Sequence, residues 1–366
     1  MSSPADLDAA RPRRGCAASL ALVLLPVAGL SCVTWLAYGL SWWSAALALG
    51  LVLLVLGLLL LQAQPRFGWR LLAAGGLLLL GPWLVRVLWV SGSEQARLTT
   101  LPADSGASLL SRLYPEADGT LAAAGLLRTT GGLRDPQAHE LSELLQQAYA
   151  RTDPPAASFP TPAIATYLGL QSSTSFDTIV LRPPPQRVAP DGAVVFLHGY
   201  AGSFYVYCWE MAQAAAAANL LTLCPSLGAD GKWWLPQGDA TLQATLDYAH
   251  RIGMNRVYLA GLSNGAVGAS ALAPKHQQRL AGLVLISGSG TTAPPNLPVL
   301  MVQGSTDQMM PAAAARAYAA QSSRIIYREV AGGHFVFLSA HERVRPLLAE
   351  FLSNLEKRAT ALPRAR

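Results

Sequence analysis

The pattern of apolar and polar residues divides the chain into parts of different character. The first part carries no charged residue between Arg14 and Arg66, a stretch of 51 residues. A soluble helix of that length would show a polar face, and this stretch shows none, so burial in a soluble fold is disfavoured. The pattern predicts two membrane-spanning helices over residues 16–40 and 44–61, each near the roughly 20 residues that cross a bilayer.

A third apolar segment, residues 71–90, is interrupted by Arg86. Arg86 lies near one end of the segment, where its long side chain can reach the membrane interface. Trp83 and Trp89 flank it as interfacial aromatic residues do. We expect three spans, with two spans as the alternative.

The number of spans decides on which side the rest of the chain lies. Three spans put both basic clusters in the cytoplasm and everything after about residue 91 outside it, whereas two spans leave the C-terminal part in the cytoplasm. No small-residue cleavage site follows the first segment, which indicates an anchor rather than a cleaved signal. We therefore expect a multi-pass protein of a bacterial inner membrane with a periplasmic domain. The basic clusters are Arg11, Arg13 and Arg14, and Arg66 and Arg70.

The next part, residues 91–162, is expected to be a connector. It contains turn-rich stretches at 115–119 and 131–132 and one amphipathic helix over 136–150. A proline-rich linker, "TDPPAASFPTP", closes it and marks a domain boundary. The expected organisation is a basic tail (1–15), a transmembrane region (16–90), this connector, a folded domain (163–358) and a short tail (359–366).

In the folded domain, short apolar runs alternate with helical stretches. This alternation predicts an α/β fold, with a mostly parallel sheet and helices on both faces. The run "AVVFL" at 193–197 is typical of a fully buried parallel strand. Strands are expected at 178–181, 193–197, 220–224, 256–260, 280–287, 298–303 and 324–330, and helices at 206–218, 240–252, 266–273, 312–321 and 341–355.

One strand–helix junction carries the pattern G-x-S-x-G, in Gly261 to Gly265. A serine on such a sharp turn exposes its hydroxyl beside the N-terminal amides of the helix. The pattern also arises by chance in a chain rich in glycine and serine, so it needs partners. A serine hydroxyl becomes an effective nucleophile only with a base in hydrogen-bond reach. Ser263 is the candidate nucleophile.

The partners should follow other strands, because the carboxyl ends of parallel strands meet at one edge of the sheet. His334, in "AGGHF", follows the strand at 324–330 and is the candidate base. Asp307, in "QGSTDQMMP", follows the strand at 298–303 and can orient the imidazole. Asp307 is equally suited to capping a turn or helix. Asp230 and Asp239 are the alternatives, and neither follows a strand directly.

The segment "FLHGYAGS" follows the buried strand at 193–197. Its turn exposes backbone N–H groups, and those of Tyr200 and Asn264 can bind the oxyanion of a tetrahedral intermediate. His198 in this turn is expected to be structural. Trp233 and Trp234, in "GKWWLPQ", are candidates for lining an apolar pocket, with plain packing as an equal alternative.

Taken together, residues 162–355 resemble the α/β-hydrolase superfamily. The resemblance rests on the chain order Ser263, Asp307, His334, on Gly261–Gly265 as the nucleophile elbow and on His198-Gly199 as the oxyanion turn. Only about ten residues separate the strands at 280–287 and 298–303, where many members carry a lid. The chain is therefore similar to lidless esterases and to the dienelactone-hydrolase-like group, and the resemblance implies that neither a metal nor an organic cofactor is needed.

Composition changes this picture little. The net charge of +6 comes with 24 arginines and 3 lysines but no basic cluster with interleaved aromatic residues after the apolar part, so nucleic-acid binding is excluded. The cysteines have no metal-ligand spacing. Cys16 and Cys32 lie in the first span, whereas Cys208 and Cys224 can form a disulfide if their domain is exported, or remain buried thiols if it is cytoplasmic.

The sequence thus predicts a membrane-anchored serine hydrolase that acts on carboxylic esters, either small or lipid-like. Acyl transfer to another acceptor, or peptide hydrolysis, could use the same residues. A non-catalytic membrane protein with a ligand-binding domain is the remaining alternative. The acyl chain length, the leaving group and the oligomeric state do not follow from the sequence.

Overall fold

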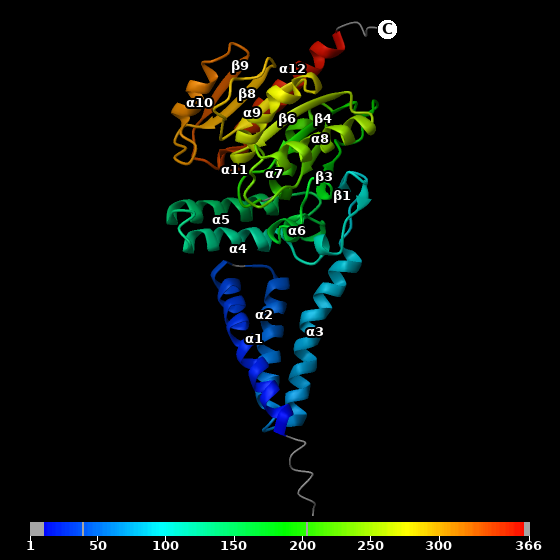
Figure 1. Cartoon of the computed structure of the whole chain (residues 1–366), viewed down its shortest axis with the longest axis vertical. Helices are drawn as coiled ribbons and strands as arrows, with labels where there is room; N and C mark the ends of the chain where they lie inside the picture. The colour runs from blue at the N-terminus through cyan, green and yellow to red at the C-terminus, as the bar shows by residue number, and fades with distance from the viewer. Residues whose placement is uncertain (1–10, 39, 203, 362–366) are drawn as a thin grey trace, which may run out of the picture.

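The computed structural model describes residues 11–38, 40–202 and 204–361, and arranges them in three layers along one long axis (Figure 1). Three long helices form one end, a layer of short helices lies in the middle, and an α/β domain forms the other end. The long helices are α1 (Arg11–Tyr38), α2 (Trp42–Leu60) and α3 (Pro65–Trp89). All three are long and apolar enough to cross a membrane, including the segment that Arg86 interrupts.

Arg86 does not extend toward a membrane interface, contrary to our expectation. Its side chain is buried, and it donates hydrogen bonds to the carbonyl oxygens of Arg112, at 2.9 Å, and Ala157, at 2.5 Å, in the middle layer. Its guanidinium also lies 5.6 Å from the ring centroid of Trp43. Arg86 therefore joins the end of α3 to the layer above it.

The α/β domain is built on a nine-stranded sheet of order β2-β1-β3-β5-β4-β6-β7-β8-β9. The strands from β5 to β9 run parallel, while β3 is antiparallel to both of its neighbours. The strands are β1 (Ala96–Leu101), β2 (Ser105–Gly106), β3 (Phe176–Leu181), β4 (Gly192–Leu197), β5 (Leu221–Pro225), β6 (Arg256–Leu262), β7 (Gly282–Ile286), β8 (Val299–Gly304) and β9 (Ile325–Val330).

Every strand expected after residue 162 is present, but the sheet begins earlier. Strand β1 lies in the segment that we expected to be a connector, and it pairs with β3 over six residues. The expected domain boundary after residue 162 therefore does not separate two structural units. The sequence of β1, "ARLTTL", gave no strand signal because its apolar residues, at 96, 98 and 101, do not keep the alternation that marks a strand.

Helices cover both faces of the sheet and bury its apolar side chains. One face packs against α7 (Phe204–Ala216), α11 (Val336–Ser339) and α12 (His341–Ala361). The other packs against α8 (Pro236–Arg251), α9 (Asn264–His276) and α10 (Ala312–Ala319). The loops that follow the parallel strands are therefore where a functional site is expected.

The middle layer is dominated by a pair of helices, α4 (Glu116–Thr129) and α5 (Asp135–Ala150), which we call the cap hairpin. The sequence predicted α5 but not α4, because Pro115 and Gly119 suggested a turn. Proline is compatible with the start of a helix, and Glu116 and Asp118 suit its first turn. The layer also contains η2 (Leu110–Arg112), η3 (Ala156–Ser158) and α6 (Ala163–Tyr167), and η4 (Gln277–Arg279) follows α9.

The cap hairpin lies between the long helices and the α/β domain (Figure 1). On one side, a Cβ on Gly125 of α4 would lie 2.0 Å from the ring of Tyr38 in α1, so this contact requires glycine. On the other side, the carboxylate of Glu116 accepts a 2.7 Å hydrogen bond from the N–H of Tyr205, at the start of α7. The cap hairpin thus contacts both neighbouring layers.

Candidate active site

Ser263 occupies the turn between β6 and α9. Its backbone has φ 55° and ψ −120°, a strained conformation that functional sites retain. The turn is tight: a Cβ on Gly265 would lie 2.0 Å from the carbonyl oxygen of Leu197, and one on Gly261 would lie 2.2 Å from that of Gly265. The two glycines of the G-x-S-x-G pattern are therefore required by packing.

The structure brings Ser263, His334 and Asp307 together. Nε2 of His334 lies 2.9 Å from the hydroxyl oxygen of Ser263, and Nδ1 lies 2.9 Å from Oδ2 of Asp307. The carboxylate is fully shielded from solvent and the imidazole nearly so, whereas Ser263 is partly accessible. This is the geometry of a nucleophile, a base and an orienting carboxylate.

The surroundings of Asp307 fix the tautomer of His334. Oδ1 accepts hydrogen bonds from the N–H groups of Met309 and Met310, both at 2.9 Å. Oδ2 accepts a 2.8 Å hydrogen bond from Nε2 of Gln303. A carboxylate can only accept from the imidazole, so Nδ1 carries the proton and the lone pair of Nε2 faces Ser263. Asp307 therefore caps its own turn and also orients His334. The sequence did not single out Gln303 as a site residue, because this glutamine lies in strand β8 and belongs to no recognisable motif.

The turn after β4 lies directly beside Ser263. A Cβ on Gly199 would be 3.2 Å from the Cβ of Ser263. Two hydrogen bonds hold the turn at Ala201, whose N–H donates to Ala229 at 2.6 Å and whose carbonyl accepts from Tyr167 at 2.5 Å. In the described part of the chain, the N–H of Tyr200 donates to no backbone carbonyl. Asn264 is the first residue of α9, so its N–H has no partner within the helix. These two N–H groups are therefore the candidates for binding an oxyanion.

His198 is a structural residue, as its position in the turn suggested. Its Nδ1 donates to the carbonyl of Gly199 at 2.8 Å, and its Nε2 accepts from the N–H of Leu227 at 3.1 Å. Burial lowers the pKa of His198 to about 4, which keeps the ring neutral. It therefore braces the turn without being available as a base.

Trp233 does not line a pocket, in contrast to one of our two expectations. It is fully buried, and its Nε1 donates a 2.9 Å hydrogen bond to the carbonyl of His198. Trp234 is 41% exposed, and neither tryptophan is among the residues around Ser263 that form the cavity. The packing alternative is correct for Trp233, because its ring packs edge-to-face against His198 of the turn after β4, with 5.2 Å between the ring centroids.

A small cavity of about 80 Å³, partly open to solvent, is lined by Ser263 and His334. The turn after β4 forms one wall, and the cap hairpin forms the opposite wall. The cap hairpin contributes Thr120, Ala123, Ala124, Leu127, Leu141 and Leu145. Seven of the 17 residues that line the cavity thus come from the segment we expected to be a connector. The sequence gave no signal for this because these residues carry no reactive group.

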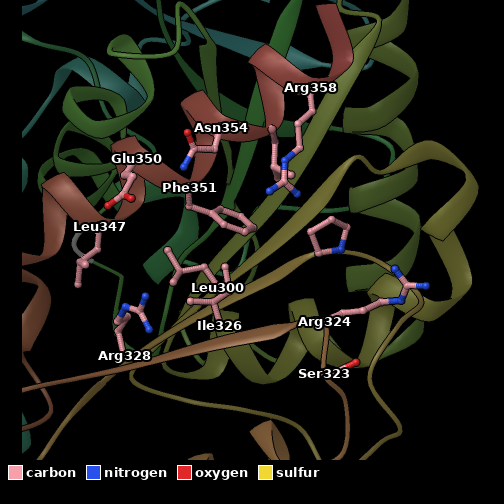
Figure 2. Close-up of a pocket in the computed structure, with 12 residues that line it drawn as sticks. Leu300, Ser323, Arg324, Ile326, Arg328, Leu347, Glu350, Phe351, Asn354 and Arg358 are labelled. Atoms are coloured by element: carbon pink, nitrogen blue, oxygen red, sulfur yellow. The ribbon is translucent and has the colours of Figure 1, made fainter. Parts of the chain in front are cut away.

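A larger groove, of about 560 Å³, lies elsewhere in the domain (Figure 2). Pro298 and Arg324 place it at the amino ends of β8 and β9, beside α12, whereas the catalytic loops follow the carboxyl ends of the strands. None of Ser263, Asp307 and His334 lines it. The smaller cavity, which Ser263 and His334 line, is therefore the candidate active site. Among the described residues, no group of three or more His, Cys, Asp or Glu side chains is placed to hold a metal ion.

No protein-family model matches the sequence, and no curated protein matches it. Solved structures resemble it over about half of its length. Est1E from Butyrivibrio proteoclasticus is 15% identical, with 50% of this chain and 94% of that chain covered and a TM-score of 0.43. XC6422 from Xanthomonas campestris, described as an α/β serine hydrolase without lid, is 17% identical, with 53% and 93% covered and a TM-score of 0.42. An α/β serine hydrolase homologue from Coxiella burnetii is 20% identical, with 48% and 91% covered and a TM-score of 0.41.

The strand order, with the antiparallel β3 and the elbow after β6, decides the fold class. The C-terminal part of this chain has the α/β-hydrolase fold. Its hydrolase domain carries no lid between β7 and β8, where only residues 287–298 intervene, as we expected. The cover over its site comes instead from the cap hairpin, which precedes most of the domain in the sequence.

Proposed function

We propose that this chain is a membrane-anchored serine hydrolase that cleaves carboxylic esters. The observation that carries the proposal is the pair of 2.9 Å contacts that link Ser263 to His334 and His334 to Asp307. Three elements of the chain that are far apart in sequence meet there in the arrangement that nucleophilic catalysis needs.

In the proposed acylation step, Nε2 of His334 takes the proton of Ser263 as the hydroxyl oxygen attacks the ester carbonyl. The carbonyl π bond breaks and its electron pair becomes an oxyanion, held by the N–H groups of Tyr200 and Asn264. Asp307 stabilises the imidazolium. When the oxyanion collapses, the bond to the alcohol oxygen breaks and His334 returns its proton to the leaving alkoxide.

Deacylation repeats the sequence with water. His334 removes a proton from a water molecule that attacks the acyl-serine, and the same amides hold the second oxyanion. Collapse releases the carboxylic acid and returns the proton to Ser263. An alcohol or amine in place of this water would give an acyltransferase with the same residues, so product analysis decides between the two.

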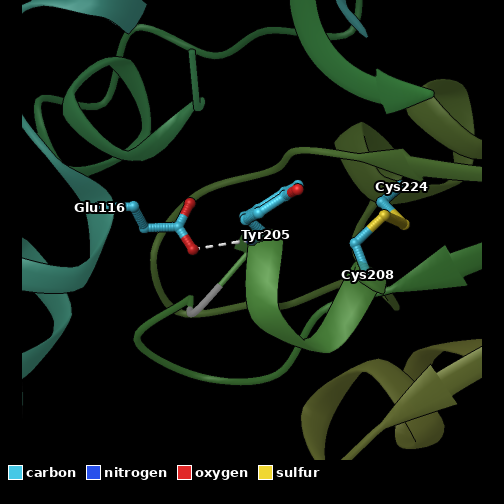
Figure 3. The surroundings of a disulfide bond; sticks show 4 residues. All are labelled: Glu116, Tyr205, Cys208 and Cys224. Carbon is cyan, nitrogen blue, oxygen red and sulfur yellow. Dashed lines mark hydrogen bonds between the residues drawn. A yellow bond between two sulfur atoms is a disulfide. The ribbon is translucent and has the colours of Figure 1, made fainter. Parts of the chain in front are cut away.

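The proposal also places the hydrolase domain outside the cytoplasm. Three apolar helices put both N-terminal basic clusters on the opposite side from the domain. Cys208, in α7, and Cys224, in β5, form a disulfide (Figure 3). Disulfides persist in oxidising compartments such as the bacterial periplasm and are rare in the cytosol. Both features favour an enzyme anchored in an inner membrane that faces the periplasm.

The activity can be tested with the full chain in detergent and p-nitrophenyl acetate as substrate. We expect steady hydrolysis by the wild type and a loss of at least about a thousandfold in kcat for Ser263→Ala. Ser270→Ala, in the same helix, is the matched control and should retain activity. Equal hydrolysis by Ser263→Ala and wild type would remove the proposed nucleophile.

The orientation can be tested with alkaline phosphatase fused after the last residue of the full chain. This reporter is active only outside the cytoplasm, so we expect activity. An inactive phosphatase together with an active cytoplasmic reporter at the same position would place the domain in the cytoplasm.

A further inference from the structure

The cap hairpin presents one face to the active-site cavity and the other to the membrane helices. Leu127 of α4 and Leu141 of α5 line the cavity, whereas the neighbouring Leu126 is 62% exposed and does not. The cavity wall opposite Ser263 therefore consists of aliphatic side chains from outside the catalytic loops.

The chemistry of this wall favours an uncharged acyl group. No Asp, Glu, Lys or Arg is among the described residues that line the cavity. Leucine, alanine, methionine and phenylalanine provide most of the surface, and Thr120 provides a hydroxyl. A charged acyl group would lose its hydration here without gaining a partner, which is costly.

The size of the cavity favours a short acyl group. At about 80 Å³ it is far smaller than the roughly 300–1,000 Å³ of pockets that enclose whole drug-sized ligands. A buried water occupies about 10–15 Å³ of cavity volume, so a cavity of about 80 Å³ has room for about six groups the size of a water molecule. An acetyl to butanoyl group fits this space, whereas a fatty acyl chain does not.

Anchors on both sides restrict any expansion of the cavity. Asp118 of α4 accepts hydrogen bonds from the N–H and hydroxyl of Ser41 and the hydroxyl of Ser44, at 3.0, 2.5 and 2.5 Å. Glu116, two residues earlier in the chain, accepts a hydrogen bond from the N–H of Tyr205 of the hydrolase domain. The cap hairpin is thus fixed to the membrane helices and to the catalytic domain at the same time.

We propose that the cap hairpin restricts this enzyme to esters of short, uncharged acyl groups of about two to four carbons, with Leu127 and Leu141 setting the limit. The alcohol part of the substrate lies outside the cavity. This inference rests on the proposed esterase function and adds its substrate class.

The test compares kcat/KM for p-nitrophenyl acetate, butanoate and octanoate, which share one leaving group. We expect the wild type to prefer acetate over octanoate by at least about a hundredfold. Leu127→Ala and Leu141→Ala should each reduce this preference about tenfold or more by improving octanoate turnover. Leu126→Ala, on the outer side, is the matched control and should leave the preference unchanged.

A substitution that makes the cavity smaller tests the inference even if the leucine variants do not fold. Ala123→Val narrows the same wall, so butanoate turnover should fall about tenfold while acetate turnover changes less. A wild type that hydrolyses octanoate as well as acetate would overturn the inference, as would an unchanged preference in every folded cap variant. If either result is obtained while ester hydrolysis still depends on Ser263, the proposed esterase function stands. If the wild type hydrolyses none of these esters, the esterase function itself is contradicted.

Discussion

Oδ1 of Asp118, in the cap hairpin, accepts a 3.0 Å hydrogen bond from the backbone N–H of Ser41, in the segment between α1 and α2. Asp118 is buried and lies at the N-terminus of α2, where a negative charge is favourable. The apolar helices and the cap hairpin, which lines the cavity over Ser263, are therefore joined directly. Through this contact the apolar helices help to hold the cap hairpin in place.

Removing this contact should destabilise the chain. Asp118→Ala leaves the N–H and hydroxyl of Ser41 without their buried acceptor, so we expect the free energy of unfolding to fall by about 1–3 kcal/mol. Denaturant unfolding of the full chain in detergent measures it. Asp135→Ala removes the exposed pair with Arg128 and should cost less than about 1 kcal/mol. Equal losses in the two variants would show that Asp118 is not a buried anchor.

Glu116 predicts a pH dependence of stability. Burial raises the pKa of its carboxyl to about 7, so between about pH 4.5 and 7 the folded chain holds more protons than the unfolded chain. The free energy of unfolding should therefore fall as the pH rises through this window, by up to about 3 kcal/mol from this group.

Glu116→Gln should remove that part of the pH dependence, because an amide keeps an acceptor for the Tyr149 hydroxyl and the Tyr205 N–H but does not titrate. Glu140→Gln, at an exposed position of α5, is the control and should leave the slope unchanged. Denaturant unfolding at pH 5 and pH 8 gives the slope for each variant. Parallel slopes for wild type and Glu116→Gln would contradict the assignment.

Asp307→Asn should reduce kcat by about three to four orders of magnitude with little change in KM. An amide nitrogen facing Nδ1 favours the wrong tautomer of His334, whose protonated Nε2 can no longer accept the proton of Ser263. The loss should not add to that of Ser263→Ala in the double variant, because the residues act as a unit. Strictly additive losses would show that Asp307 acts elsewhere.

The four cysteines should fall into two classes. Cys16 and Cys32 are free thiols, whereas Cys208 and Cys224 are joined. A thiol-alkylating reagent should therefore modify two cysteines in the denatured chain without reductant and four after reduction, as read by intact mass. Four modifications without reductant would show that the disulfide does not form, and would weaken the proposed location outside the cytoplasm.

The sequence predicted those features that repeat a strong local pattern. Hydrophobic patterns indicate the apolar helices and the strands after residue 162, and glycine spacing indicates the elbow at Ser263. His334 and Asp307 could be chosen because parallel strands deliver their following loops to one edge of the sheet. The structure places both side chains beside Ser263, and their catalytic roles remain proposals.

The parts that the sequence did not predict depend on tertiary contacts. Strand β1 pairs with β3 over six residues, and this pairing cannot be read from its own sequence, in which apolar residues do not alternate regularly. Helix α4 is preceded by Pro115 at its N-cap and contains Gly119, and in isolation both residues are turn signals. From the sequence, Trp233 could equally line a pocket or pack in the core. The hydrogen bond from its Nε1 to the carbonyl of His198, a contact between distant residues, shows that it packs in the core. These features depend on contacts between residues far apart in the sequence, which local patterns do not reveal.

The central claim is that Ser263 is the nucleophile, and covalent labelling tests it most directly. The full chain is treated with a fluorophosphonate, digested with trypsin and analysed by fragmentation mass spectrometry. One tryptic peptide, residues 257–275, contains both Ser263 and Ser270, so the fragments distinguish the two side chains. We predict a single adduct on Ser263 that disappears in His334→Ala, because the hydroxyl then lacks its base. An adduct on Ser270 or on another peptide, with Ser263 unmodified, would contradict the account.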